Sequence, residues 1–292
     1  PVCDYEGSDY RTRFWENQNR NYEDLVERVA LRRLMPAHGR TLIEIGAGFG
    51  RLAAEYTGYD RVVLFDYSRS LLREAQAKWG DDERFIYVAG DWYKMPFVAG
   101  LFDTMVQIRT IHHAADVPAL FTQLRRIARP NGDYILEFAN KRNLKAMLRH
   151  ALGRQNWSPY ALDPIEFAEL NFDFHPRWIQ EQLRQHEFAP GRVLTVSHFR
   201  IATLKRLVPT SLLVQLDSLA QLTGNWWQVT PSVFIHNKVS PSGKVAQDDT
   251  FFVCPEDQTP LPITSSNGIL RCLTCGRGWP AEKGFYDFKE SV

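Results

Sequence analysis

Three closely spaced glycines are the first feature of this sequence that can support chemistry. The stretch TLIEIGAGFG, residues 41–50, is a short apolar run that contains Glu44 and ends in Gly46, Gly48 and Gly50. Glycine after a buried strand lets the backbone approach a ligand closely, and a following helix would present unpaired N–H groups. The pattern predicts a site for a nucleotide-like ligand. Its plain alternative is a tight turn that serves packing only.

Acidic residues at the ends of the next two predicted strands narrow the choice of ligand. Asp66 ends the run RVVLFD, where a carboxylate can accept hydrogen bonds from both ribose hydroxyls. Asp91 follows the third run, where it can accept from an adenine amine, and Glu44 can hold a cationic amino acid group. The glycines do not have the G-x-G-x-x-G spacing of a dinucleotide site. The alternative for Asp66 is a helix cap, which Ser68 can also supply.

Basic residues follow the fourth predicted strand at the mouth of the same crevice. His112 and His113 are candidates for a general base, and a purely structural role is their alternative. Arg109 can anchor a carboxylate or phosphate of an acceptor, or it can pair with a nearby acid.

Strand-like and helix-like segments that would position these residues alternate along the chain. Helices are expected over residues 21–35, from 51 to 56, and over 70–79 and 117–127. The expected strands are residues 41–46, 61–68, 84–92, 102–111, 133–140, 191–199 and 232–239. This alternation predicts a doubly wound α/β fold, with a mostly parallel seven-stranded sheet covered by helices on both faces.

The domain organisation follows from changes in this rhythm. We expect an N-terminal helical lid segment over 1–36, a main domain over 37–240 with a helical insertion at about 141–230, and a small module over 251–292. Tyr10 and Trp15 of the lid can provide aromatic walls for the ligand, or simply pack on the core. The linker NKVSPSGKVAQDDT between the last two regions has few apolar residues.

The insertion is where acceptor specificity is expected, because loops at the carboxyl ends of strands form such pockets. It is rich in aromatic residues, which suits an apolar or planar acceptor. Three polar residues are placed to contact that acceptor: Asn140, His175 and Arg177. A basic helix can face lipid headgroups or RNA, or be an ordinary solvated face; its cations are Lys141, Arg142, Lys145 and Arg149.

Bulk composition excludes several classes of protein. The 292 residues are 44% hydrophobic and 24% charged, with a formal net charge of +1. That balance is typical of a soluble globular protein and produces no global field toward nucleic acid or membrane. No apolar run reaches the roughly 18 residues of a membrane span, and the first residues do not resemble a secretory signal. We therefore expect a cytoplasmic protein, whose oligomeric state the sequence leaves open.

Taken together, these motifs resemble class I S-adenosylmethionine-dependent methyltransferases, particularly the group of ubiquinone and menaquinone C-methyltransferases. The motifs EIGAGFG, FDYS, GDWYKMPF, FDTMVQIRTIHH and RIARPNGDYILEF carry the likeness, over residues 34–140 and more loosely to 239. The resemblance implies S-adenosylmethionine as cofactor. It also implies which residues contact each part of the cofactor. The methionine moiety is lined by Glu44, Gly46, Gly48 and Gly50, and the ribose is bound by Asp66. The adenine lies at Tyr67, Asp91 and Trp92, and the crevice near the sulfonium is closed by Ile108 and Arg109.

The C-terminal segment carries three of the four cysteines, which indicates a metal site more than a disulfide framework. Residues 253–288 resemble the zinc-ribbon-like activator subunit of tRNA methyltransferases, although the fourth expected ligand is an aspartate here. The resemblance implies a Zn²⁺ site formed by Cys254, Asp257, Cys272 and Cys275. The alternative is a decayed site whose fold rests on Trp279, Phe285 and Phe288. Cys3, far away in the sequence, is expected to be a free thiol.

The sequence therefore favours S-adenosylmethionine-dependent methyl transfer to a small-molecule or lipid- or quinone-like acceptor. An RNA methyltransferase is the alternative, because the tail and the basic helix favour it while the near-neutral charge opposes it. A third hypothesis is a non-catalytic scaffold with this fold, which the loss of a cofactor-binding acid would support. No such acid is lost.

Overall fold

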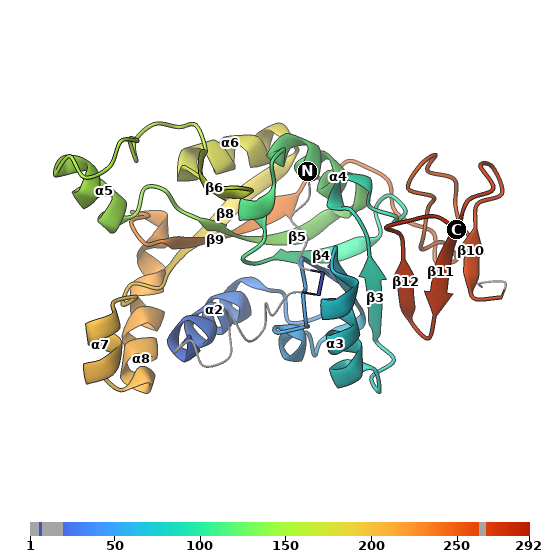
Figure 1. The fold of residues 1–292 in the computed structure, drawn as a ribbon, viewed down its shortest axis with the longest axis horizontal. Coiled ribbons are helices and arrows are strands. Elements are labelled where there is room, and N and C mark those ends of the chain that lie inside the picture. The colour runs from blue at the N-terminus through green and yellow to red at the C-terminus, as the bar shows by residue number, and fades with distance from the viewer. Residues whose placement is uncertain (1–5, 8–19, 263–266) are drawn as a thin grey trace.

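The computed structural model describes residues 6–7, 20–262 and 267–292, and one large sheet runs through it (Figure 1). Two antiparallel strands, β9 and β8, follow its parallel centre beyond β5. All seven strands expected from the sequence are present: β1 Gly39–Ile45, β2 Tyr59–Asp66, β3 Phe85–Ala89, β4 Phe102–Gln107, β5 Ala128–Ala139, β8 Phe188–Val196 and β9 Ser232–Val239.

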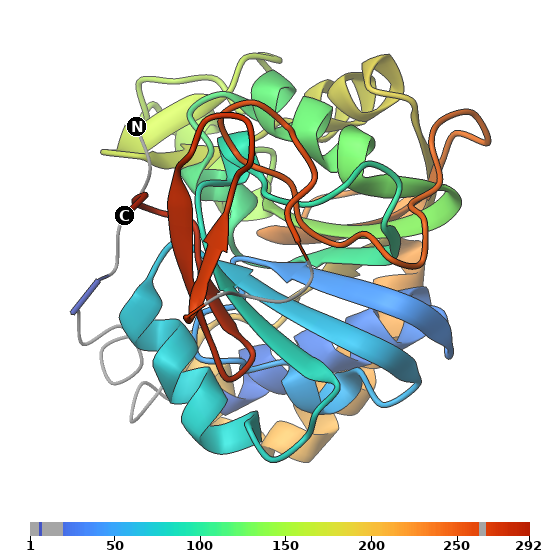
Figure 2. The same ribbon diagram turned by 90° about the vertical axis from the view of Figure 1, so that its right-hand side faces the viewer.

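The C-terminal tail adds three strands, so the sheet has ten strands rather than the seven expected. β12 (Phe285–Asp287) lies parallel to β3, and β11 (Gly278–Glu282) and β10 (Ile269–Arg271) follow outward in antiparallel order. Without β12, β3 would be an edge strand with unpaired backbone groups, which favours such pairing. The tail is therefore continuous with the main sheet instead of forming a sheet of its own (Figure 2).

Helices cover both faces of the sheet, as expected for a doubly wound α/β fold. α4 (Val117–Ile127) and α6 (Pro176–Gln185) lie on one face; α2 (Asn21–Leu34), α3 (Arg69–Trp79) and α8 (Thr210–Ala220) lie on the other (Figure 1). Along β1, Leu42 packs into one core and Ile43 and Ile45 pack into the other, which places apolar residues on both faces of the strand.

The insertion after β5 is only partly helical. It contains α5 (Leu144–Ala151), a two-stranded sheet of β6 (Ile165–Ala168) and β7 (Asn171–Asp173), and α7 (Ala202–Leu207). The 3₁₀ segment η4 (Gln221–Asn225) leads from α8 back to β9. Within the described ranges, no helix has the length and apolar character needed to cross a membrane.

One local expectation was wrong. The helix expected from Arg51 to Tyr56 is a single 3₁₀ turn, η1 (Ala53–Glu55), because the chain returns at once to β2. The expected helix α2 is present, and its buried face carries two acids, Glu23 and Glu27, as well as apolar residues. Glu27 has its partners in the site described next.

Candidate functional site

The glycine loop after β1 is held against the ends of β2 and β4. The backbone N–H groups of Gly46 and Ala47 donate to the Phe65 carbonyl at 2.8 and 3.1 Å. Gly46 has φ of +74°, and a Cβ there would lie 2.2 Å from Cγ2 of Thr110. Only glycine fits both the backbone conformation and the contact with Thr110. The loop is therefore a tight turn, and it also lines a cleft.

Asp66 fixes the open side of that loop. Its Oδ2 accepts a hydrogen bond from the Gly48 N–H at 2.7 Å, and its Oδ1 accepts from the Ser68 N–H at 2.8 Å. The cap of α3 is Ser68, whose hydroxyl accepts from the Leu71 N–H. Of the two alternatives for Asp66, helix capping is thus supplied by Ser68, and the Asp66 carboxylate lies at the carboxyl edge of the sheet.

Glu44 is the most unusual side chain of the cleft. It is buried on β1, and its Oε2 has no hydrogen-bond partner within the part of the chain that the structure describes. Burial raises the pKa of Glu44 to about 8, while the positive charge of Arg51 and the neighbouring Tyr56 hydroxyl oppose this shift. A cationic group that enters here would supply both the missing hydrogen bond and the missing charge. The cleft is lined by Glu44, Gly46, Ala47, Gly48, Phe49, Arg51, Ile108, Arg109 and Thr110.

Arg109 pairs with an acid. It has a φ of +60°, uncommon for a residue with a side chain, and its Nε donates to Glu27 Oε1 at 2.6 Å. Its backbone N–H donates to Glu137 Oε2 at 2.8 Å, and Arg51 donates to the other Glu27 oxygen at 3.0 Å. Glu27 is fully buried, and Arg109 and Arg51 hold its pKa below the ordinary value against the effect of burial. The arginine thus forms a fixed wall of the cleft.

The sequence analysis missed Glu27 and Glu137. In the sequence, Glu27 lies at a helical spacing from apolar residues of α2, and Glu137 lies inside the run DYILEF. Each fits an ordinary amphipathic or apolar pattern and does not stand out from it. A buried acid needs a partner, but the sequence alone shows neither the burial nor the partner.

The residues expected near adenine lie beyond the ends of β2 and β3. Asp91 begins the 3₁₀ segment η2 (Trp92–Lys94), and its Oδ1 accepts from the Tyr93 N–H at 2.8 Å. Tyr67 follows Asp66, and the Nζ of Lys289 from the tail lies 3.9 Å from the centroid of its ring. The structure thus brings the predicted cofactor residues to one edge of the sheet and adds a tail residue to them.

The two histidines form the 3₁₀ segment η3 (Ile111–His113) after β4. Their ring centroids are 4.0 Å apart, and His113 Nδ1 lies 2.9 Å from the Leu170 carbonyl oxygen. Burial lowers the pKa of both rings, most strongly for His112, whose neighbours His113 and Arg109 contribute further. Both rings therefore favour the neutral form that a general base needs, and the same burial makes them weaker bases than an exposed imidazole.

The residues expected to contact an acceptor are placed less uniformly. The Asn140 side chain is buried and donates to the carbonyls of Gln228 and Thr230 at 3.1 and 2.8 Å. His175 is buried as the cap of α6, and its Nδ1 accepts from the Arg177 N–H at 3.2 Å. The Arg177 residue itself is exposed. Tyr10, Trp15 and also Cys3 lie outside the described residues.

Asp173 is a further acid near the end of β5 that the sequence analysis did not single out. The backbone of the next residue, Phe174, pairs with Ala139 at 2.9 Å and with Lys141 at 3.0 Å, which holds β7 beside β5. Burial raises the pKa of Asp173 to about 6, and the negative charge of Glu137 adds to this shift. Because β7 was not predicted, nothing in the sequence placed this acid at the site.

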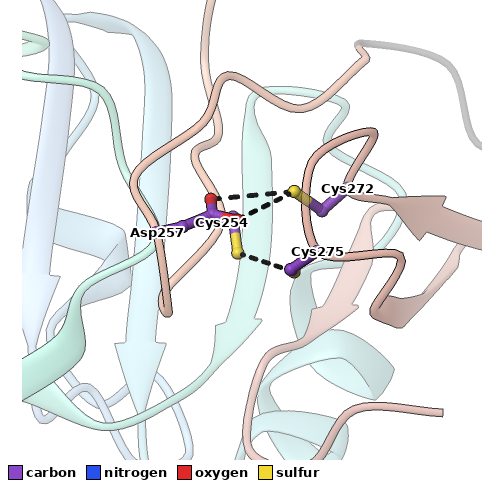
Figure 3. Close-up of side chains that lie close together, drawn as sticks. All are labelled: Cys254, Asp257, Cys272 and Cys275. Carbon is purple, nitrogen blue, oxygen red and sulfur yellow. Dashed lines mark hydrogen bonds between the residues drawn. The ribbon is translucent and has the colours of Figure 1, made fainter.

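The four predicted metal ligands converge in the tail (Figure 3). Their ligand atoms all lie within 4.8 Å of one another. The Sγ atoms of Cys254 and Cys275 are 3.7 Å apart, and Cys272 Sγ is 3.4 Å from Asp257 Oδ2. Zn–S bonds of about 2.3 Å in a tetrahedron place two sulfur atoms about 3.8 Å apart. The donor set and its spacing fit a tetrahedral metal ion.

Beside this cluster, the tail is joined to the cofactor side of the sheet. The Phe288 N–H donates to the Ala89 carbonyl at 2.7 Å, and Arg69 Nε donates to Asp287 Oδ2 at 2.6 Å. Trp279, Phe285 and Phe288 are buried. The tail thus reaches the residues that follow β2 and β3 in the cleft.

Comparison with known proteins identifies the central segment. Residues 43–136 match the family model described as "Methyltransferase domain". This central third of the chain is therefore similar to a methyltransferase domain. The matched residues run from β1 into β5, so the domain contains the glycine loop, Asp66, Asp91 and the histidine pair.

Curated relatives match the same part of the chain at low identity. A demethylmenaquinone methyltransferase of Roseiflexus sp. is 33% identical over 97 residues, which cover 32% of this chain and 40% of the relative. A sterol 24-C-methyltransferase of Pneumocystis carinii is 28% identical over 101 residues, covering 33% and 27%. The chain thus spans less than half the length of these two relatives.

Solved structures extend the likeness to the whole fold. An S-adenosylmethionine-dependent methyltransferase from Mesorhizobium loti superposes with a TM-score of 0.54 at 19% identity, covering 75% of this chain and 100% of that one. A chain from a complex that contains the Haloferax volcanii Trm112 methyltransferase activator gives 0.54 at 16%, covering 80% and 95%. The chain therefore shares the fold of these two structures.

Proposed function

We propose that this chain transfers a methyl group from S-adenosylmethionine to an apolar, quinone- or sterol-like acceptor. The observation that carries the proposal is the unpaired, buried Oε2 of Glu44 in a cleft that the glycine loop lines. An ammonium group of an amino acid moiety satisfies this oxygen and favours the ionised form of Glu44.

The residues present fit the remaining parts of that cofactor. The Asp66 carboxylate, which accepts from the Gly48 and Ser68 N–H groups, would also accept from the ribose hydroxyls. The aromatic rings of Tyr67 and Trp92 and the carboxylate of Asp91 would hold the adenine. Ile108 and the fixed side chain of Arg109 would close the cleft near the sulfonium.

The chemistry then needs positioning more than activation. When bound, S-adenosylmethionine supplies an electrophilic methyl group; the S–CH₃ bond breaks with its electron pair left on sulfur, and the acceptor forms the new bond. The cleft walls orient the acceptor in line and exclude water. A carbon or hydroxyl acceptor must also lose a proton. His112 and His113, neutral at pH 7, are the proposed general base.

The proposed acceptor class rests on two observations. The relatives named above act on a demethylmenaquinone and on sterols by name. In the insertion, the Phe174 and Trp178 rings stack with centroids 5.6 Å apart, and Phe172 lies 6.5 Å from Phe174. Phe172 lies in β7, and the other two rings follow it at the carboxyl end of β5. A flat apolar acceptor would pack against the partly buried Phe172 and Trp178, beside the proposed base.

We also propose that the tail cluster of Cys254, Asp257, Cys272 and Cys275 holds a structural Zn²⁺. Four protein ligands leave no open coordination position, so the ion would hold the two halves of the tail together and take no part in the reaction.

The test combines native mass spectrometry with a transfer assay. We expect a mass increment of one S-adenosylmethionine, and transfer of a labelled methyl group to a prenylated hydroquinone or a sterol but not to tRNA. Asp66→Asn is expected to lose the increment, whereas Asp60→Asn, an exposed acid at the start of β2, should keep it. Transfer to tRNA would overturn the acceptor class. The absence of any increment at saturating cofactor would overturn the proposed function as a whole.

A further inference from the structure

Exposed apolar side chains are concentrated in one part of the molecule. Among the described residues, eighteen large hydrophobic side chains are strongly exposed, and fourteen of them lie between Leu144 and Trp227. Scattered exposed leucines are ordinary, but a concentration of this kind marks an interaction surface. We call it the apolar-cationic surface; its apolar members on helices and in the following loop are Leu144, Leu148, Leu152, Leu207, Leu212, Leu216, Leu219, Leu222, Trp226 and Trp227.

The elements that carry this surface lie at the end of the molecule opposite the tail, with α5 at the top and α7 and α8 at the bottom of the view (Figure 1). α8 continues directly into η4 and then into the two tryptophans. The Leu144 N–H at the start of α5 donates to the Val229 carbonyl at 2.8 Å, which joins α5 to the same loop. The pairing of Ala139 with Ser232 places that loop at the carboxyl edge of the sheet, the edge of the cofactor cleft.

The charges of this region have one sign. Residues 138–162 contain five lysines and arginines and no acid. Residues 188–247 contain a single acid, Asp217, which is fully buried and accepts a hydrogen bond from Tyr22. Lys145, Arg149 and Arg206 are exposed, and none of them forms an ion pair within the described part of the chain. Lys141, expected on the same helix, instead precedes α5 and is buried.

We propose that the apolar-cationic surface docks this protein onto an anionic lipid bilayer, with the leucines and Trp226 and Trp227 inserted among the acyl chains and the cations at the headgroups. Helices that lie in a membrane interface combine exposed leucine and tryptophan with lysine and arginine in this way. A nucleic acid partner would use the cations and aromatic rings but would leave the exposed leucines without a contact. The surface does not depend on methyl transfer, so docking is tested without cofactor.

The test is co-sedimentation of the full chain with vesicles. We expect binding to vesicles of phosphatidylglycerol and phosphatidylcholine, and little binding to phosphatidylcholine alone. Trp226→Ser with Trp227→Ser, and separately Lys145→Glu with Arg149→Glu, should each weaken binding at least tenfold. The control variants Leu273→Ser and Lys283→Glu change exposed residues of the tail and should bind like the wild type. A blue shift of tryptophan emission on vesicle binding should disappear in the tryptophan variant.

Three results would overturn the proposal. The first is no binding to anionic vesicles at any ionic strength tested. The second is binding that high salt abolishes and that the tryptophan substitutions leave unchanged, which would indicate a general affinity for polyanions. The third is a concentration-dependent dimer, lost in the tryptophan variant and without vesicle binding, which would show that a second copy covers the surface.

Discussion

The two ends of the molecule differ in whether their apolar side chains are buried or exposed. Beyond β3, the tail pairs its strand β12 with the main sheet and buries the rings of Phe252, Trp279, Phe285 and Phe288. Beyond β5, the apolar-cationic surface leaves leucines and two tryptophans exposed among cations. One end is closed by a segment of the same chain, and the other is covered by nothing within the described residues.

Because of this difference, the tail should contribute to stability and the apolar-cationic surface to recognition. Apolar area removed from water within the chain stabilises the fold whatever the surroundings, at about 25 cal/mol per Å². The same kind of area left exposed contributes only when a partner removes it from water. Substitutions at the two ends should therefore change different measurements, and the following changes test that division.

The largest effect is expected from the cysteine cluster. Cys272→Ser removes a buried proposed ligand, and loss of the ion should lower the free energy of unfolding by about 4 kcal/mol or more, since metal loss is among the few single changes of that size. Thermal unfolding together with the zinc content of the purified protein measures this.

Leu273→Ala is the matched control, because this neighbouring residue in the same turn is 88% exposed. Equal unfolding temperatures for the wild type, Cys272→Ser and a chelator-treated sample would mean that the tail holds by its aromatic contacts alone.

Substitution of one tryptophan at each end allows a direct comparison of the two ends. Trp279 is 2% exposed and Trp226 is 84% exposed. Trp279→Ala should cost about 3–5 kcal/mol of stability, as for other large-to-small core changes. Trp226→Ala should stay within about 0.5 kcal/mol. Chemical denaturation measures both values.

The vesicle assay should give the opposite order, with Trp226→Ala weakened and folded Trp279→Ala unaffected. If both variants lost stability to a similar extent, the apolar-cationic surface would belong to the core and the division between the two ends would be wrong.

The features that the sequence predicted well depend on local patterns. The seven strands, the glycine loop and the acids after β2 and β3 lie in short segments whose apolar runs and turn residues are adjacent. Positive φ at Gly46, Gly48 and Gly50 follows from residue type, so the sequence alone locates the loop. The resemblance of the tail to the zinc-ribbon-like activator subunit likewise named the four residues that converge.

The features that the sequence missed depend on contacts between distant segments. The pairing of β12 with β3 joins residues about two hundred positions apart, and nothing in either strand specifies the other. The pairing of Glu27 with Arg109 is of the same kind. The single 3₁₀ turn after the glycine loop is a local failure, because AAEY favours a helix that the short return to β2 leaves no room to form.

Between the two ends, the cofactor cleft gives a prediction of intermediate size. With a pKa of about 8, Glu44 holds a proton at pH 7, whereas a cationic ammonium group binds its ionised form. Binding must therefore release a proton, and the affinity for S-adenosylmethionine should fall about tenfold from pH 7 to pH 6. The α-amino group, with an ordinary pKa of about 7.7–8.0, stays charged over this range.

Calorimetric titration at both pH values, in two buffers of different ionisation enthalpy, measures the affinity and the proton release together. Glu44→Gln should bind more weakly and with little dependence on pH. The same pH dependence in the wild type and in Glu44→Gln would assign the proton to another group of the cleft.

The smallest effect concerns the place where the tail meets the cleft. Lys289 lies over the Tyr67 ring, and its side chain is only 6% exposed, so the tail supports a residue proposed to contact adenine. Lys289→Met keeps the aliphatic stem and removes the charge, and should weaken cofactor binding about two- to fivefold, as expected for loss of a cation–π contact. Lys283→Met, an exposed change in the turn before β12, is the control. A lower unfolding temperature with unchanged cofactor affinity would show that the tail only closes the sheet. A weaker affinity at unchanged stability would show that the tail also takes part in cofactor recognition. The division between stability and recognition would then hold for the aromatic core of the tail but not for its contact with Tyr67.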